Sequence, residues 1–524
     1  PFDRRNRGAR PATRGEEAKP ISWHEYGAPG TLPSLMAQYL TSVGMEVHAE
    51  LLTRSKMFCR CPVAFGGEPN TRVCPVCLAM PGSLPVPNRR AVELVVMTAL
   101  ALQCTIARHS IFHRKNYFYP DLPKGYQISQ YGESYPIGYG GFLEIPTASG
   151  TKRIRIRRVH LEEDTGKLMH LPGGGSGVDY NRAGVPLMEI VTDFPPDIES
   201  SDEAKEYLTH LRQILVYLGV CNGKMEEGSL RCEPNISVRV AGSEQYGTKT
   251  ELKNLNSFRS VQLGVQFEVR RQIAVLEQGG RVLQETRGWN EGTETSFLMR
   301  TKEEENDYRY FPDPDLVPMT FSEEQIEAIR AELPELPATK LARYRDTFGL
   351  SDYDAGILVA ERHWAEWFEA CVELGGDPKM VCNWMNSDFA RLLNDSGQSA
   401  VLAGRESERE SSKISPAHLV DLLRLVTSNT ISGKIAKEVF TESFQSGEMP
   451  TSLVEKKGAT QISDVDAIAA WCRQAIDENP DPVEKYRAGQ EGAIGFLVGQ
   501  VMKKSQGRAN PMVVQEILRG ELTS

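Results

Sequence analysis

The chain has 524 residues, a formal charge of −10 and a pI near 5.6, with 40% hydrophobic and 25% charged residues. This length exceeds what one hydrophobic core usually organises, so two to four domains are expected. The acidic balance argues against a protein that holds nucleic acid through its overall charge, but it does not exclude a local basic surface.

The first twenty residues, PFDRRNRGARPATRGEEAKP, carry five arginines and no apolar periodicity. Arginine enrichment is typical of organelle transit peptides, whereas Asp3, Glu16 and Glu17 depart from their acid-poor composition. A disordered tail fits the same residues. Because the chain starts at Pro1, we expect a fragment or a processed form. Residues 1–43 are therefore expected to be a leader or extension, disordered in part.

The segment GMEVHAELL, from residue 44, alternates polar and apolar residues in the manner of a strand. Glu46, His48 and Glu50 should therefore project from one face. Other acids follow in RIRIRRVHLEEDTGK and TELKN, and for each of them a solvated surface carboxylate is the simpler interpretation. If such acids converge in space, they can bind Mg²⁺, which prefers oxygen ligands. Histidine is a less natural ligand for that cation, so His48 suits a water-mediated or orienting role.

Four of the ten cysteines occur as two pairs, Cys59-x-Cys61 and Cys74-x-x-Cys77, on a Gly/Pro-rich loop. The other six are scattered, as is usual for free thiols in a reducing compartment. A tetrahedral zinc can take one pair from each short turn, and four sulfur ligands would leave no position for water. We therefore predict a structural zinc site. The alternative is four unrelated buried thiols.

Downstream, AVELVVMTALALQCTIA (residues 91–107) is predicted to be a buried helix, because it is too short and too interrupted to span a bilayer. The stretch RKNYFYPDLPKGYQ combines cations, amides and rings between prolines, which indicates a binding loop. Its rings are able to stack on bases or clamp phosphates, and an aromatic-rich β-edge is the alternative. The glycine-rich GGGSG at residues 173–177 lacks the P-loop lysine and is predicted to be a hairpin linker.

After residue 318 the pattern changes to helices with recognisable starts. The segment SEEQIEAIRAEL has capping-box spacing from Ser322 to Gln325. Two further segments begin with a cap and a proline, at Ser415-Pro416 and Asn510-Pro511. The fold class is therefore predicted to be α+β, with a mixed-sheet domain containing the Cys₄ knuckle and helical domains after it. The predicted divisions are residues 44–318, 319–430 and 431–524.

Nine motifs together resemble one family. They are SKMFCRC, PNTRVCPVCLAMPGSLPVPN, RKNYFYPDLPKGYQISQY, HLEEDTGK, VDYNRAGVPLMEIV, MEEGSLRCEPNISVR, KNLNSFRSV, QETRGW and DYRYFPDPDL. In this order they are similar to the B subunit of glutamyl-tRNA(Gln)/aspartyl-tRNA(Asn) amidotransferase, from about Gly44 to the end of the chain. The chain departs from the family's pattern at two places. GMEVH stands where the family usually has glycine-leucine-glutamate-valine-histidine. TDFPPDIES, around Asp193, stands where the family usually has serine-glutamate-proline-aspartate.

The resemblance implies a carbon–nitrogen ligase. Such a subunit uses ATP and Mg²⁺ to phosphorylate the side chain of glutamate mischarged on tRNA(Gln), and ammonia then displaces the phosphate. The implied magnesium ligands are Glu46, His48, Glu163 and Glu251, with Glu162 beside them. Lys115 matches a position lining the ammonia tunnel. The candidate ATP contacts are Asn116, Tyr117, Tyr119 and Lys124.

The resemblance also implies partners. Ammonia comes from an amidase subunit that hydrolyses glutamine, and a small third subunit completes a heterotrimer. The segment near the C-terminus resembles the family's tail domain, which contacts tRNA. Lys503, Lys504 and Arg508 would contact phosphates there, although a solvated helix end fits them equally.

Two interpretations from other classes remain open: a zinc-containing RNA-binding scaffold without catalysis and a metal-dependent hydrolase. The arginine-rich leader favours a mitochondrial form, and the bacterial cytoplasm is the alternative location.

Overall fold

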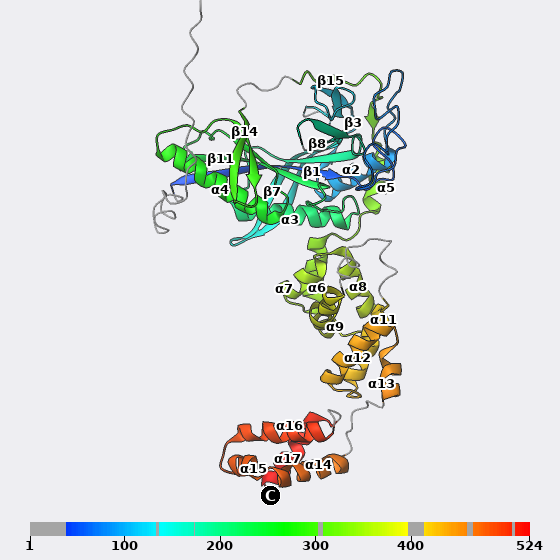
Figure 1. Ribbon diagram of the computed structural model, residues 1–524, viewed down its shortest axis with the longest axis vertical. Coiled ribbons are helices and arrows are strands. Elements are labelled where there is room, and N and C mark those ends of the chain that lie inside the picture. Colours follow the sequence, from blue (N-terminus) through cyan, green and yellow to red (C-terminus); the bar gives the residue numbers. More distant parts are fainter. Residues whose placement is uncertain are drawn as a thin grey trace, which may run out of the picture.

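The computed structural model describes residues 38–132, 136–171, 173–301, 308–396, 413–457, 465–505 and 509–523. These residues form three hydrophobic clusters in chain order, and Figure 1 shows three successive parts along the longest axis. The first part is a mixed α/β domain and the other two are helical. The predicted α+β class is thus confirmed.

The first part is organised by a nine-stranded sheet with the order β14-β13-β12-β11-β1-β10-β7-β6-β2. Strands β12 and β13 run parallel, whereas β1 runs antiparallel to both of its neighbours, so the sheet is mixed. Its strands are β1 (Tyr39–Glu50), β2 (Thr105–Ile106), β6 (Gly138–Thr147), β7 (Gly150–Glu163), β10 (Pro186–Thr192), β11 (Leu230–Val240), β12 (Thr250–Lys253), β13 (Glu285–Asn290) and β14 (Thr295–Thr301).

Smaller sheets flank it. They comprise β3 (His109–Ser110) with β16 (Met319–Thr320), β4 (His113–Asn116) with β5 (Tyr126–Ser129) and β15 (Phe311–Pro312), and β8 (Lys167–His170) with β9 (Ser176–Asp179). The β8–β9 pair is an antiparallel hairpin. Its connection includes Gly173, Gly174 and Gly175, all at positive φ, which agrees with the predicted hairpin linker.

Three helices pack on one face of the large sheet: α2 (Arg89–Ala101), α3 (Ser201–Tyr217) and α4 (Phe258–Glu277). The alternation in β1 explains this arrangement, because Val43, Met45, Val47 and Ala49 are fully buried in the core that these helices share. Residues between them on the same strand therefore point to the opposite face. That face carries the polar side chains described below.

Two boundaries differ from the predictions made from sequence. The helix predicted over residues 91–107 ends at Ala101; Gln103 adopts a positive φ of 57° and the chain then enters β2, which pairs with β6. The leader predicted over residues 1–43 is shorter than expected, because β1 starts at Tyr39, whose partner on β11 is Val240. In both cases pairing with a distant strand decides the boundary. Residues 1–37 lie outside the described part of the chain.

The helical parts follow α5 (Glu323–Ala331), which still packs on the first cluster through Ile326. The second cluster contains α6 (Pro337–Phe348), α7 (Asp352–Val359), α8 (Arg362–Glu373), α9 (Pro378–Trp384), a π-helical turn (Met385–Phe389), α10 (Ala390–Asp395), α11 (Pro416–Thr427), α12 (Gly433–Ser446) and α13 (Pro450–Lys457). The third contains α14 (Val465–Glu478), α15 (Pro480–Arg487), a short 3₁₀ turn (Glu491–Ala493), α16 (Ile494–Lys504) and α17 (Pro511–Thr523).

The helix starts predicted from sequence are confirmed. Ser322 and Gln325 form a reciprocal capping box at α5, while α11 and α17 begin at Pro416 and Pro511. The division expected at residue 430 falls inside the second cluster, because Ile431 and Phe440 pack there with the preceding helices. Among the described residues, no helix combines the length and the apolar character needed to cross a bilayer.

Candidate active site and cysteine cluster

The polar face of the large sheet carries a row of ionisable side chains at its centre. On β1, His48 lies opposite Glu189 of β10, and Glu189 lies opposite His160 of β7. Residues that face each other across antiparallel strands share one side of the sheet. The three side chains are therefore neighbours by register, although 112 positions separate the first from the last along the sequence (160 − 48).

Glu46 and Glu162, two residues along their strands, complete the group. His48 Nε2 lies 3.5 Å from Glu189 Oε2, 3.6 Å from Glu162 Oε1 and 3.8 Å from Glu46 Oε1. His160 Nε2 lies 3.4 Å from Glu189 Oε2. We call these five residues the carboxylate–histidine cluster. Its members range from almost fully buried to about one-third exposed at Glu46, so one side opens to solvent.

Burial and neighbouring charges shift the protonation of this cluster. Burial and the nearby Glu189 raise the pKa of Glu46 to about 7. Burial alone would lower the pKa of His48, but its contact with Glu189 and the charges of Glu162 and Glu46 raise it to about 9. For Glu189, His160 and His48 outweigh burial and hold the pKa well below its usual range. The raised pKa values of Glu46 and His48 mean that the cluster holds protons tightly near neutral pH, and a metal ion bound there would displace them.

The donor set fits a divalent metal ion. Glu46, His48 and Glu189 offer three ligand atoms within 4.8 Å of one another, and His160, Glu162 and Glu189 offer a second such group that shares Glu189. Three carboxylates provide the oxygen ligands that Mg²⁺ prefers, and the open side leaves room for water and phosphate.

The predicted magnesium set is divided by the structure. It brings Glu46 and His48 together, but Glu163 is bound elsewhere: its carboxylate accepts hydrogen bonds from Lys124 Nζ at 2.6 Å and from the backbone N–H of Ile128 at 3.0 Å. Consecutive residues of a strand point to opposite faces. Glu162, predicted to lie beside the ligands, therefore takes the place in the cluster that had been expected for Glu163.

Glu251 also lies outside the cluster. It sits on β12 opposite Asn235 of β11, two strands away from Glu46. Its carboxylate accepts a hydrogen bond from Thr286 Oγ1 at 2.7 Å and lies 3.4 Å from Lys253 Nζ. Glu251 therefore borders the polar face and is separated from the ligand groups by β11.

Sequence reasoning missed Glu189 and His160. Glu189 is the one charged residue in the apolar strand PLMEIVT, and its side chain is only 10% exposed. A buried carboxylate is costly unless it is paired or binds a metal, so this isolated acid was itself a signal. His160 carries a weaker signal: it precedes Glu162 by two positions and hence shares its face.

Lys115 lies beside the cluster in an aromatic setting. It is on β4, with Nζ 4.9 Å from the ring centre of Tyr308 and 5.9 Å from that of Tyr117. Burial by itself would lower the pKa of Lys115, but Tyr310 and the Glu162 charge raise it on balance, so the amine stays protonated. This places a half-buried cation within electrostatic reach of Glu162.

The predicted ATP contacts all belong to the loop between β4 and β5 or to its edges. Asn116 Nδ2 donates to the carbonyl of Arg309 at 2.7 Å, and Tyr117 packs edge-on against Tyr308. Tyr119 and Lys124 line an open cavity of about 460 Å³. A second cavity of about 210 Å³ adjoins Lys124 and reaches the cysteine pairs. The segment thus contains both an open loop and the β-edges of β4 and β5, and its role in binding stays a prediction.

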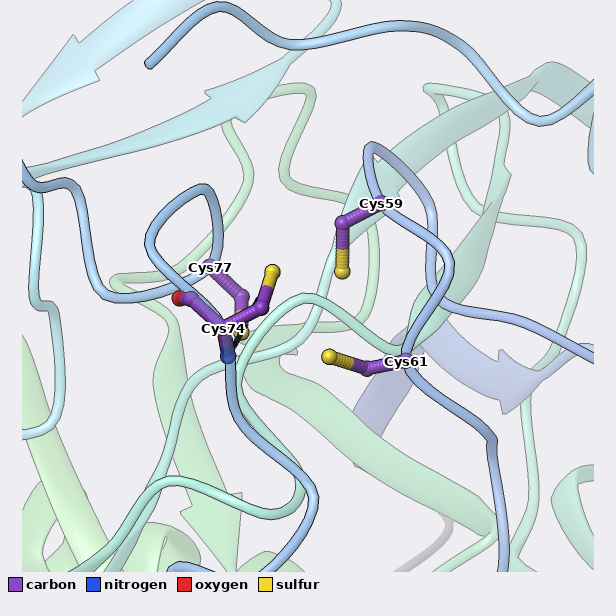
Figure 2. Close-up of side chains that lie close together, drawn as sticks. All are labelled: Cys59, Cys61, Cys74 and Cys77. Carbon is purple, nitrogen blue, oxygen red and sulfur yellow. Dashed lines mark hydrogen bonds between the residues drawn. The ribbon is translucent and has the colours of Figure 1, made fainter. Parts of the chain in front are cut away.

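The four cysteines of the two pairs lie together. Figure 2 shows Cys59, Cys61, Cys74 and Cys77 directing their sulfurs toward a common centre, from two stretches of chain. All four Sγ atoms lie within 4.8 Å of one another, and those of Cys74 and Cys77 are 3.9 Å apart. A tetrahedral zinc with Zn–S bonds of about 2.3 Å needs sulfurs about 3.8 Å apart. The clustering prediction is confirmed, and the geometry fits zinc.

Charge and hydrogen bonds support the same site. A hydrogen bond from Cys59, with further help from the Lys56 ammonium, lowers the pKa of Cys77 to about 4. Lys56 is buried and also donates to the carbonyl of Tyr180 at 3.0 Å. A thiolate beside a buried ammonium suits metal binding, because thiolate is the ligand form of cysteine.

The cysteine loop is joined to the segment that leads into β10. Asn70 exchanges hydrogen bonds with residues 178–180, through Asp179 Oδ1 at 3.0 Å, the carbonyl of Val178 at 3.0 Å and the N–H of Tyr180 at 2.8 Å. Asn181 then binds Arg72 N at 2.7 Å and the carbonyl of Glu68 at 2.7 Å. The loop is therefore fixed to the chain that continues into the strand carrying Glu189.

The predicted tRNA contacts lie at the end of α16. Lys503 and Lys504 occupy its last turn, and Lys504 Nζ forms an ion pair with Glu478 at 2.7 Å. Arg508 lies outside the described residues.

Comparison with known proteins gives consistent results. Residues 41–327 match the family model described as GatB/GatE catalytic domain, and residues 366–522 match the one described as GatB domain. Two relatives, each named as the B subunit of an aspartyl/glutamyl-tRNA(Asn/Gln) amidotransferase, are 52% identical to this chain. The protein from Caldanaerobacter subterraneus aligns over 93% of this chain and all of its own length, and that from Thermodesulfovibrio yellowstonii over 92% and 98%. The protein of the same name from Brevibacillus brevis is 50% identical over 93% of this chain and all of its own length.

Proposed function

Because this chain belongs to the family of tRNA amidotransferase B subunits, we propose that it activates and amidates the side chain of glutamate mischarged on tRNA(Gln). The names of its relatives include both the aspartyl and the glutamyl reaction. In this proposal the chain acts within a complex, with an amidase subunit that releases ammonia from glutamine and a small third subunit.

The proposed reaction has two steps. A carboxylate oxygen of the glutamyl side chain attacks the terminal phosphorus of ATP; the bond to the β-phosphate oxygen breaks, ADP leaves and an acyl phosphate forms. Ammonia then attacks the acyl carbon, the carbon–oxygen bond to phosphate breaks, and the attacking nitrogen loses a proton as the amide forms. The first step joins two anions, so its main requirement is positive charge at the transferred phosphoryl group.

The observation that carries the proposal is the convergence of Glu46, His48 and Glu189 on the open polar face. These residues would hold Mg²⁺, with Glu162 and His160 beside them. When bound there, Mg²⁺ would neutralise phosphate charge and orient the nucleotide. The contribution of the protein is to hold the carboxylates close together although their mutual repulsion opposes it. Burial, together with the nearby Glu189 charge, raises the pKa of Glu46 accordingly.

Lys115 suits the second step. Its half-buried ammonium lies near the rings of Tyr117 and Tyr308, within electrostatic reach of Tyr310 and Glu162. In the proposal, ammonia arrives along this side, and the adjacent carboxylate accepts the proton released when the amide forms. The tail helices, with Lys503, would contact the tRNA backbone.

A scaffold that binds zinc and RNA without catalysis does not require the carboxylate–histidine cluster. The relatives named above are bacterial, which agrees with a bacterial origin and gives the expected mitochondrial location no support. Zinc at the four cysteines remains part of the proposal.

An isotope experiment tests the activation step. The purified complex would receive ATP, Mg²⁺, glutamine and Glu-tRNA(Gln) whose side-chain carboxylate carries ¹⁸O. Activation through an acyl phosphate transfers one ¹⁸O into inorganic phosphate for each glutamine formed. Phosphate without label, or ATP hydrolysis that is equally fast with uncharged tRNA, would refute the proposal and favour the scaffold or the hydrolase.

A further inference from the structure

We infer that Arg158 binds the phosphoryl group transferred from ATP. This inference rests on the proposed function. Arg158 lies on β7, two residues before His160 and hence on the same face as the carboxylate–histidine cluster. Its Nη2 donates to Glu189 Oε1 at 3.3 Å, while the other oxygen of Glu189 faces His48 and His160. Arg158 therefore stands at the edge of the cluster and contacts its central carboxylate.

A register shift in β7 turns Arg158 toward this face. Ile154 and Ile156 are buried in the core, and so are Val159 and Leu161, so the alternation changes phase between 156 and 159. The pairing with β10 is irregular at the same place, between Val191 and Thr192. Without the shift, Arg158 would point into the core together with Ile154 and Ile156. Bulges that redirect a side chain are common next to active sites.

Arg158 has more unused donor capacity than Arg231 and Lys253, two other cations on this face. Arg231 is bound to Asp164 at 2.9 Å, and Lys253 lies between Glu233 at 2.5 Å and Glu251 at 3.4 Å. Arg158, in contrast, has one partner at 3.3 Å within the described part of the chain, and one-third of its side chain is exposed. A guanidinium carries five N–H donors in a planar fork that matches phosphate oxygens.

The position and the free donors of Arg158 suit it to contact the phosphoryl group of a bound nucleotide. A nucleotide bound at the open side of the cluster, where the side chains of Glu46 and Arg158 are each about one-third exposed, brings its terminal phosphoryl within reach of the guanidinium. Arg158 donates to the phosphoryl oxygens from the side facing away from Glu46, and this contact strengthens as charge spreads over those oxygens during transfer. Its weak bond to Glu189 holds the side chain in position beforehand.

The test uses the complete complex with Glu-tRNA(Gln), and it measures ADP formation at varied ATP and at varied Mg²⁺. Arg158→Gln should lower kcat/KM for ATP about 100-fold, and the Mg²⁺ concentration for half-maximal rate should change less than threefold. Arg158→Lys should recover only part of the rate, because it keeps the charge but loses the fork. Arg153→Gln is the matched control, since Arg153 is an exposed arginine of the same strand that pairs with Glu144.

Three results would overturn the inference. Arg158→Gln could retain normal ATP kinetics. It could instead require much more Mg²⁺ with an unchanged KM for ATP, which would make Arg158 a positioning residue for Glu189. Arg158→Lys could restore the full rate, so that charge alone suffices. If the unmodified complex makes no ADP with mischarged tRNA, the proposed function itself fails and the inference with it.

Discussion

Replacing Glu189 by glutamine should cost the complex most of its response to Mg²⁺. Glutamine keeps the shape of the side chain but removes its negative charge. Because Glu189 belongs to both groups of potential metal ligands, each group loses that charge. The ligand atoms lie within 4.8 Å of one another, so a cation among them lies within about 4 Å of this carboxylate. At an effective dielectric constant of about 20, unit charges at that distance interact by about 4 kcal/mol, and the double charge of Mg²⁺ makes this a lower bound. This corresponds to at least roughly a thousandfold change in the Mg²⁺ concentration needed.

The assay is ADP formation with Glu-tRNA(Gln), titrated with Mg²⁺ at saturating ATP. Glu144→Gln is the control, because Glu144 lies on β6 of the same sheet and pairs with the exposed Arg153. Circular dichroism and a melting curve show whether Glu189→Gln still folds. A variant that folds and shows the half-activating Mg²⁺ concentration of the unmodified protein would refute the assignment of this carboxylate as a ligand.

Three further predictions concern other parts of the chain. Cys77→Ser should abolish the binding of one zinc ion per chain. Cys104 is a buried thiol of the core, so the control variant Cys104→Ser should keep the zinc. Metal analysis of the purified proteins measures both, and zinc retained in Cys77→Ser would contradict the assignment. Arg343 holds the pKa of Glu335 below its usual value near 4.5, so this pair stabilises the fold above pH 4.5 and loses its contribution as the pH falls through the lowered pKa. Hydrogen exchange of α6 should accelerate over that range, and Arg343→Gln should flatten the change; an equal acid response in both proteins would contradict the pairing. Lys503→Ala should weaken tRNA binding and reduce the slope of log Kd against log salt by about 1, whereas an unchanged slope would remove Lys503 from the interface.

Local signals predicted much of the fold. The alternation GMEVHAE placed Glu46 and His48 on one face because the side-chain period of a strand is two, and the structure shows them together. The cap at Ser322 and the proline at Pro416 marked helix starts, since a terminal N–H needs a side-chain partner and proline lacks that N–H. The cysteine pairs were predicted from their spacing alone. Each of these features is decided within a few residues of chain.

Non-local relations explain the remaining differences. Choosing between Glu162 and Glu163 requires the register of β7 against β10, which the sequence of β7 does not contain. The polar face of β7 is also displaced by the irregular pairing near Val191. Glu189 acquires its role because β10 lies between β1 and β7, so that two histidines from different strands reach it. Sheet order, set by the whole domain, decides this site.

The hydrogen bonds from Asn70 and Asn181 to the neighbouring backbone have an evolutionary consequence. They fasten the cysteine loop to residues 178–181 through amide side chains, with no metal involved, and each is worth about 1 kcal/mol net. A related protein that has lost the four cysteines would keep these hydrogen bonds, and the segment leading into β10 would stay in place. Asn70 and Asn181 should therefore be retained in relatives that lack the cysteines.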